Sequence, residues 1–298
     1  MRKRTLSVLA AAAVVITAPQ ALAFGTIRGL GQNAEHETIT RNGLAVFGFG
    51  PNTMNQLAGT NGTFGAVGAP DNPARGLMGT HAAHCDGGDY FNTPGYGQTQ
   101  PAAQAQLTAC RTYMAARLQD AVNDAAGVVR ADMSLGNVSL VGGCTFNGVK
   151  GRDKCNVLED LGLLLHASQD FYSHSNWVDT VAAPGTVNNP PGLNNNAPAP
   201  WLSLRGAAGP FPAGLITGCY DGFPETLYCN GRVKHAYLNK DTTGTARGLP
   251  AYNLAMTVAA RDTAAKWDDF KQALAAAYGG ARASKIICAV KSDTPTAC

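Results

Sequence analysis

The sequence is short of charged residues, and its basic residues gather in no internal block. Charged side chains make up 14% of the 298 residues, and the formal net charge is +3. Arg2, Lys3 and Arg4 supply three positive charges at the amino end, so the rest of the chain is close to neutral. Proteins that bind nucleic acid through its phosphates usually carry a basic patch or stripe. The composition therefore gives no support to electrostatic binding of nucleic acid.

Other signatures are missing as well. After the first residues, no stretch is long and apolar enough to span a bilayer. The chain has no Gly-x-Ser-x-Gly motif, so a serine hydrolase of that type is not expected. Glycine-rich stretches such as residues 48–50 lack the strand and helix that flank a phosphate-binding loop.

The amino end has the pattern of a secretory signal peptide. Basic residues at positions 2–4 precede an apolar run over residues 6–18, and Ala21-Leu22-Ala23 is a small-x-small cleavage site. We expect residues 1–23 to be removed after Ala23, which leaves Phe24 as the new amino terminus of a secreted protein. Residues 24–298 are enough for one large domain with a substantial core.

The chain has eight cysteines, an even number that indicates disulfides in an exported protein. Eight cysteines allow 105 pairings, and none is spaced like a thiolate zinc site. Short separations favour the pairs Cys144–Cys155, Cys219–Cys229 and Cys288–Cys298, which leaves Cys85 with Cys110.

Apolar periodicity predicts a mainly helical protein with almost no strand. We expect long helices from Pro101, over residues 156–180 and over 250–278, the last stopped by Gly279-Gly280. Short helices are expected near residues 35–43 and 283–290, and mostly loop, with at most a helical turn, over 47–68. Residues 183–214 form a Pro-, Gly- and Asn-rich stretch of the kind that serves as a lid or binding loop. The predicted fold class is all-α, a single multi-helix domain with long disulfide-stapled loops.

Residues 161–177 are the most informative stretch. His166, Asp170 and His174 follow one another at intervals of four on an otherwise apolar helix, so they share one face. Two imidazoles and a carboxylate can converge on a divalent ion, and zinc takes such ligands. The alternative is a stripe of hydrogen-bonded polar residues on a core helix. Burying these groups without a strong shared partner is costly, which favours the metal.

The remaining donors lie in other segments. Of the six histidines, His36 lies between two glutamates, His84 precedes Cys85-Asp86, and His235 opens a stretch that ends at Asp241. Together with the central helix, they supply nitrogen and oxygen donors for two or three metal ions.

The pattern His166-x3-Asp170-x3-His174-Ser175-Asn176 resembles the zinc helix of Het-C-type proteins. These belong to the wider superfamily of zinc-dependent phospholipase C and S1-P1 nucleases, and the secreted CinY-type subgroup is similar. The order of donors along the chain also resembles that superfamily, over roughly residues 24–278.

The resemblance implies an all-α bundle of phospholipase C or P1 nuclease type, with a di- or trinuclear zinc cleft that activates water for phosphoester hydrolysis. It implies that Asp170 bridges two ions and that Asp71 is a ligand or the base near the attacking water. The predicted metal ligands are His36, Asp71, His84, Asp86, His166, Asp170, His174, His235 and Asp241, and the predicted catalytic residues are Asp71 and Asp170.

Three positions depart from the superfamily's pattern. Its enzymes commonly begin with a Trp whose amine and carbonyl bind metal, whereas cleavage here exposes Phe24. The ligand after Asp170 follows at four residues, as in the Het-C branch. Asn239 stands where an acidic ligand is expected, with Asp241 as the alternative.

We therefore expect a secreted zinc-dependent phosphoester hydrolase. A phospholipid substrate is preferred over nucleic acid, because basic patches are missing and residues 183–214 could make transient contact with a membrane surface. One alternative is a non-catalytic, zinc-stabilised cell-surface or interaction protein, which Asn239 favours. A second alternative is a nuclease similar to the S1-P1 enzymes.

Overall fold

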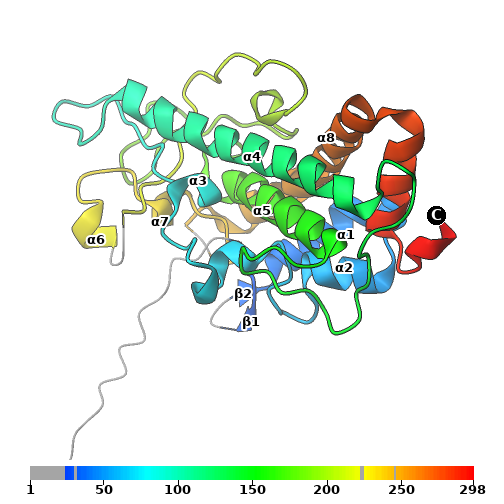
Figure 1. Cartoon of the computed structure of the whole chain (residues 1–298). Coiled ribbons are helices and arrows are strands. Elements are labelled where there is room, and N and C mark those ends of the chain that lie inside the picture. The colour runs from blue at the N-terminus through cyan, green and yellow to red at the C-terminus, as the bar shows by residue number, and fades with distance from the viewer. Residues whose placement is uncertain (1–23, 30–31, 222–224, 245) are drawn as a thin grey trace, which may run out of the picture.

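A computed structural model describes residues 24–29, 32–221, 225–244 and 246–298, and the predicted signal peptide lies outside these ranges. The described chain is mostly helical (Figure 1). Its two strands, β1 (Arg28–Gly29) and β2 (Gln32–Asn33), form one short antiparallel pair. Among the described helices, none combines the length and apolarity needed to cross a membrane.

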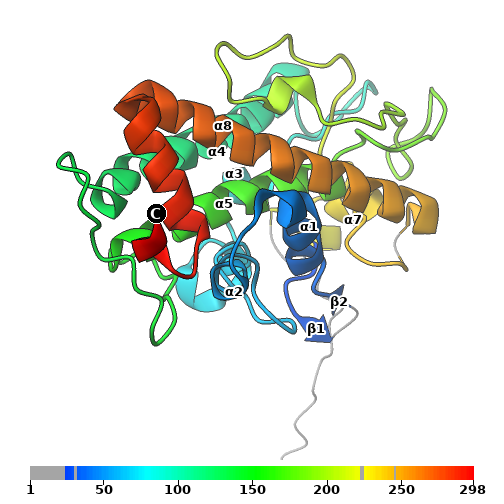
Figure 2. The same cartoon turned by 90° about the vertical axis from the view of Figure 1, so that its right-hand side faces the viewer.

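Three long helices build the core: α4 (Gln100–Val128), α5 (Asp153–His174) and α8 (Gly248–Lys291). Helix α5 lies in the middle of the molecule beneath α4 in Figure 1, and Figure 2 shows α8 crossing beside it. Nearly every residue of α5 is buried, as expected for a helix covered by neighbours all round. The polar side chains on this helix are therefore held inside the protein.

Local sequence signals explain where the long helices begin and bend. The Thr99 hydroxyl accepts a hydrogen bond from the Ala102 amide, and Pro101 occupies the first turn of α4. The predicted break at Gly279 is present as a kink within α8, where Gly279 adopts a φ of 75°. Helix α8 turns sharply at its red end in Figure 2.

Two predictions of local structure were wrong, one about where a helix ends and one about a segment expected to be mostly loop. Helix α5 ends at His174 rather than near residue 180, because the next residues are extended and the Asn176 amide donates to the Ile216 carbonyl. Residues 47–68, expected to be mostly loop, contain helix α2 (Pro51–Ala58). The Asp293 carboxylate accepts hydrogen bonds from the Asn52 and Thr53 amides at the start of α2, a distant partner that local sequence does not reveal.

The short elements carry most of the remaining site residues. The α-helical ones are α1 (Glu35–Leu44), α3 (His81–His84), α6 (Glu225–Tyr228) and α7 (His235–Leu238). The 3-10 turns are η1 (Ala45–Phe47), η2 (Ala69–Asp71), η3 (Pro73–Arg75), η4 (Pro200–Leu202) and η5 (Pro295–Ala297).

All four predicted disulfide pairs are formed. The long loop over residues 183–214 contains only η4 as a helical turn, but it is not detached from the core. Trp201 is buried, Arg111 donates to the Trp201 and Ser203 carbonyls, and the Ala199 amide donates to the Tyr172 hydroxyl. These contacts fix the middle of the loop against α4 and α5.

The Lys154 ammonium is buried at the junction of α2, α5 and the carboxyl end. It donates to the Thr53 hydroxyl at 2.8 Å and to the Ser292 carbonyl at 2.6 Å. Burial lowers the Lys154 pKa to about 8, against the opposing charge of Asp293. An unfolded lysine titrates near pH ~10.4. Between these values the unfolded chain binds more protons, so stability rises with pH.

We expect the free energy of unfolding to rise by about 2 kcal/mol between pH 8 and pH 10 relative to Lys154→Met, which has no such titration. Urea unfolding of both proteins at the two pH values measures this difference. If the free energies of unfolding of the two proteins differed by the same amount at pH 8 and at pH 10, Lys154 would not titrate in this range.

Candidate metal centre

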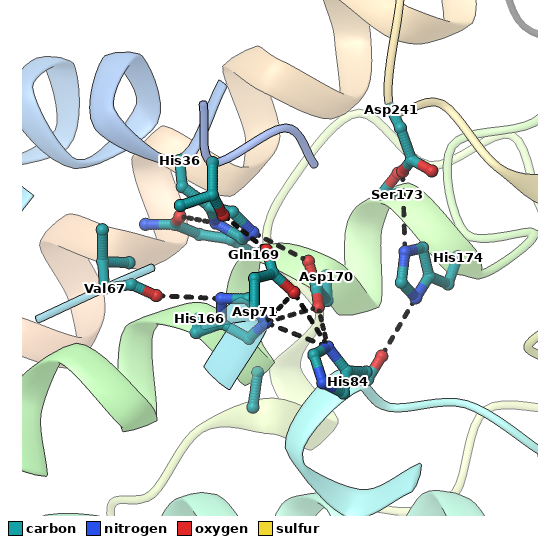
Figure 3. Close-up of polar contacts among 12 residues, drawn as sticks. His36, Val67, Asp71, His84, His166, Gln169, Asp170, Ser173, His174 and Asp241 are labelled. Atoms are coloured by element: carbon teal, nitrogen blue, oxygen red, sulfur yellow. Dashed lines mark hydrogen bonds and ion pairs between the residues drawn. The ribbon is translucent and has the colours of Figure 1, made fainter. Parts of the chain in front are cut away.

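The second half of α5 carries a group of buried donors that meets donors from three other segments (Figure 3). His166 and Asp170 lie one turn apart on α5, and both are fully buried. Asp71 of η2, His84 of α3 and His36 of α1 approach them from outside the helix. Segments far apart in the sequence thus place their side chains around one carboxylate.

Four donor atoms lie at distances suited to one shared ion. His84 Nδ1 and His166 Nε2 are 3.0 Å apart, and each is 3.0 Å from Asp170 Oδ2. Each is also 3.8 Å from Asp71 Oδ1. Ligand atoms on a tetrahedral zinc ion are about 3.4 Å apart, given bonds of about 2.0–2.2 Å. The four atoms therefore stand at nearly the spacing of a coordination shell.

The second oxygen of Asp170 faces a different histidine. Asp170 Oδ1 is 3.2 Å from His36 Nε2, and both atoms are buried without a hydrogen-bond partner among the described residues. A buried carboxylate oxygen and a buried imidazole nitrogen rarely remain unsatisfied. Asp170 thus directs one oxygen toward His36 and the other toward His84 and His166, as a bridging carboxylate could.

Hydrogen bonds on the far side of each ring fix which nitrogen is free. His166 Nδ1 lies 2.9 Å from the Val67 carbonyl, and His84 Nε2 lies 3.3 Å from the Leu77 carbonyl. His36 Nδ1 lies 2.7 Å from Gln169 Oε1. Because these oxygens only accept, each of these nitrogens carries a proton, and in the neutral ring that a metal requires the opposite nitrogen presents a lone pair. Metal-binding histidines are usually oriented in this way.

Gln169 is itself held in the orientation that this requires. Its amide nitrogen donates to the hydroxyls of Thr40 and Thr263, at 3.0 and 3.1 Å. The amide oxygen is thereby left to face His36. Sequence reasoning did not single out Gln169, because a glutamine one residue before an aspartate has no distinctive spacing.

A further cluster forms around His174 at the end of α5. His174 Nδ1 lies 2.9 Å from Asp86 Oδ1 and 3.0 Å from the His84 carbonyl, and its Nε2 lies 3.5 Å from Asp241 Oδ1. The His235 ring of α7 is 4.1 Å from the His174 ring, centre to centre. Asp86 Oδ1, His174 Nε2 and His235 Nδ1 are buried without hydrogen bonds among the described residues. Asp86, His174 and His235 can together hold a second ion.

The structure thus corrects the expectation that His166, Asp170 and His174 converge on one ion. Residues eight apart on a helix are separated by about 12 Å along its axis, too far for one coordination shell. His166 and Asp170 belong to one group, and His174 belongs to the next.

Glu225 of α6 is a candidate ligand that the sequence analysis missed. Its Oε1 is buried, lies 3.6 Å from His235 Nδ1 and has no hydrogen bond among the described residues. Asn239, where an acid was expected, uses its side-chain oxygen to accept from the Asp241 amide. Carboxylates near His174 and His235 therefore come from Asp86, Asp241 and Glu225. Glu225 lies ten residues before His235 on a separate short helix, so no helical spacing pointed to it.

The charges inside the centre are strongly coupled. Burial alone would raise the pKa of Asp170, but the neighbouring histidines His166, His174 and His36 bring it well below its usual value. Burial lowers the pKa of His84, yet the hydrogen bond and charge of Asp170 outweigh this and raise it to about 9. Asp170 is therefore ionised, and a protonated His84 beside it supplies the balancing positive charge. A divalent cation bound at the same place would take over that role and leave His84 neutral.

All nine predicted ligands lie in these neighbouring clusters. The clusters able to hold a metal ion are His36, His166 and Asp170; Asp71, His84 and His166; and Asp86, His174 and His235. Asp241 joins the last group through His174. Cys219 and Cys229 also lie near Asp221, but their disulfide removes them as thiolate ligands.

Comparison of the chain with protein-family models, curated proteins and solved structures finds no match. The chemistry of the centre therefore follows from its own donor atoms. The buried atoms without a hydrogen bond, among them His36 Nε2, Asp170 Oδ1 and His174 Nε2, fit a bound cation better than a hydrogen-bonded polar stripe, because a polar stripe would satisfy them.

Proposed function

We propose that this chain is a secreted zinc-dependent phosphoester hydrolase of phospholipase C-like type, with the fold of the zinc-dependent phospholipase C and S1-P1 nuclease superfamily. The observation that carries the proposal is the arrangement of Asp170. Its two oxygens face His36 on one side and His84 with His166 on the other, at 3.0–3.2 Å. Paired metal sites that share a bridging carboxylate are typical of enzymes that cleave phosphoesters.

Zinc suits the donor set better than magnesium or calcium. Each of the three candidate clusters consists of two histidines and one aspartate, so imidazole nitrogens supply two of its three donors. Magnesium and calcium prefer shells of oxygen ligands, whereas zinc takes nitrogen and carboxylate oxygen readily. When bound at such a centre, zinc lowers the pKa of a water ligand and polarises a phosphoryl oxygen.

The protein's own groups then have distinct tasks. Asp170 and the histidines hold the ions, and the backbone carbonyls of Val67 and Leu77 keep two of the rings in place. Asp71 is the carboxylate closest to solvent in the first group, with a side chain 10% exposed. The Thr26 hydroxyl donates to Asp71 Oδ2, which leaves Oδ1 directed at the histidines. From there Asp71 can ligate or accept the proton of the attacking water.

The amino end supports the proposed cleavage after Ala23. Phe24, the first residue of the proposed mature chain, is fully buried and its ring lies 6.0 Å from the His36 ring, centre to centre. The new terminus would therefore lie close to the metal centre. In the superfamily that this sequence resembles, the terminal amine and carbonyl are metal ligands.

A phospholipid substrate is favoured over nucleic acid. The sequence has no block of basic residues, and α6, the short helix that carries Glu225, also carries two exposed apolar side chains. Leu227 and Tyr228, two and three positions after Glu225, are 68% and 53% exposed. Apolar side chains at that position suit contact with a lipid surface.

The second candidate function is a non-catalytic protein that keeps zinc for stability. The burial of the donors favours it, because His36, His166 and Asp170 are all 0% exposed. A structural metal site is typically closed, whereas a catalytic site keeps a position open to water or substrate.

One experiment separates the two functions. We expect the mature protein beginning at Phe24 to contain two or three zinc ions per chain and to hydrolyse phosphatidylcholine vesicles or bis-p-nitrophenyl phosphate. Chelation should abolish hydrolysis and lower the Tm by roughly 5–15 °C, since the metal binds only the folded chain.

The zinc content, the turnover of each substrate and the effect of chelation on the Tm together decide between these functions. Zinc content with a chelation-dependent Tm but no turnover of either substrate, or of single-stranded DNA, would favour the non-catalytic protein. Turnover of the DNA alone would favour the nuclease. Folded protein that contains no metal and whose Tm ignores chelation would contradict both zinc-dependent functions.

A further inference from the structure

A cleft of about 520 Å³ lies apart from the metal centre. It is formed where α2 and the loop that follows it meet residues 144–147 of the loop between α4 and α5. The Gln56 side chain joins two of these segments by accepting a hydrogen bond from the Cys144 amide at 2.6 Å. The lining of the cleft includes Asn55, Gln56, Asn72, Arg75, Phe146 and Asn147.

The amide side chains of this cleft are held as donors. Their oxygens already accept hydrogen bonds, from Arg41 to Asn55, from the Cys144 amide to Gln56, from the Ala74 amide to Asn72 and from the Val149 amide to Asn147. Their nitrogens have no hydrogen-bond acceptor among the described residues. Because an amide whose oxygen is engaged by an N–H cannot flip without losing that bond, each presents its NH₂ group to the cleft or to solvent.

Arg75 is the one charged side chain among the residues that line the cleft. Its Nε lies 3.2 Å from Oε1 of the buried Glu159, which is not a lining residue, so one edge of the guanidinium is paired and its terminal nitrogens are left for a ligand. Most of the polar groups offered to a ligand are therefore donors, so a ligand must bring most of the acceptors.

Two aromatic side chains, Phe64 and Phe146, complete the lining, and both are half-buried. Aromatic rings pack well against the C–H faces of sugar rings, while amide groups and hydroxyls hydrogen-bond the ring substituents. The volume also falls within the usual range of about 300–1,000 Å³ for small-molecule sites.

We propose that this cleft binds an anionic sugar, a pyranose that carries a carboxylate or a phosphate group. The guanidinium of Arg75 recognises the anionic group, the amide donors of Asn72, Gln56 and Asn147 bind ring oxygens, and the aromatic rings contact the apolar face. The cleft is separate from the metal centre, although turn η2 touches both, with Ala69 and Asn72 at the cleft and Asp71 at the metal donors.

The test uses the mature, metal-replete protein and four probes: glucuronic acid, glucose 6-phosphate, glucose and inorganic phosphate. Ligand-detected NMR and calorimetry should show binding of one or both charged sugars and at least about tenfold weaker binding of glucose, since a charge-assisted contact contributes about 1.5–3 kcal/mol. The charged sugar that binds more tightly identifies the anionic group.

Asn147→Asp is the sharpest variant, because Asn147 is exposed and the change should not disturb folding. A carboxylate keeps the bond from the Val149 amide but replaces the NH₂ donor with a repulsive oxygen. We expect it to weaken binding at least about tenfold, whereas Asn123→Asp, an equally exposed change on α4, should leave binding unchanged. Arg75→Gln should bring the affinities for charged and neutral sugars to similar values.

Four results would overturn the proposal. They are no binding of any probe, equal binding of glucose and the charged sugars, binding of inorganic phosphate as tight as that of glucose 6-phosphate, and unchanged binding in Asn147→Asp.

Discussion

Replacing Asp170 with Asn is expected to reduce the zinc content of the mature protein from two or three ions per chain to about one. The amide keeps the size of the side chain, but one carboxylate oxygen becomes an NH₂ group that cannot bind a metal. Because Asp170 faces His36 and the His84–His166 pair at once, this single change weakens two sites. The loss in zinc affinity should be more than about 100-fold, beyond the effect of removing an outer hydrogen-bond partner. Elemental analysis after dialysis measures it.

Asp160→Asn is the matched control. Asp160 lies on the same helix, ten residues before Asp170, beside Lys150 and Arg117 rather than at the metal donors. Burial raises the pKa of Asp160 to about 7, so a neutral side chain is tolerated there. We expect its zinc content to equal that of the wild type. Unchanged zinc in Asp170→Asn would remove the bridging role, whatever the activity of that variant.

The Asp86 cluster gives the first prediction a second readout. His174, His235 and Asp86 do not use Asp170 as a ligand in their group. An ion held there should therefore survive the Asp170→Asn change, so that one zinc per chain remains. A variant with no zinc at all would mean that the two groups bind their ions cooperatively.

Gly162→Ala is expected to destabilise the protein by about 1–3 kcal/mol or more and to weaken zinc binding as well. Gly162 lies on α5 one turn before His166, and a Cβ atom there would overlap the backbone and side chain of Ala66. Backbone cannot move aside as a flexible side chain can. The segment that would shift includes Val67, whose carbonyl holds the Nδ1 proton of His166. Urea unfolding and a zinc competition assay measure the two effects.

Gly280→Ala controls for the glycine-to-alanine change itself. A Cβ at Gly280 meets nothing within 4 Å, and the residue lies in α8. Alanine favours a helix over glycine by about 0.5–1 kcal/mol, so this variant should be slightly more stable and bind zinc normally. If Gly162→Ala also left stability and zinc affinity unchanged, the close approach of α5 to Ala66 would not position His166.

Much of the centre could be predicted because the donors follow short-range rules. His166 and Asp170 are one turn apart, so the helical period alone places them on a common face. The disulfide pairs were also predictable, since three of them close short loops with separations of 10 or 11 residues. The helix start at Thr99 and the break at Gly279 follow from capping and from glycine conformation, which are local properties as well.

The sequence by itself determined which residue types gather on α5 and that His166, Asp170 and His174 share one face of it. Only the tertiary structure decided how the donors divide between ions. The sequence shows that His174 shares a face with His166 and Asp170, but His174 and His166 are eight residues apart, about 12 Å along the helix axis, so donors from other segments decide which group each joins. Asp86 and His235 arrive at His174, while Asp71 and His84 arrive at His166. Glu225 joins them from a helix whose position depends on long-range packing, which no local periodicity encodes.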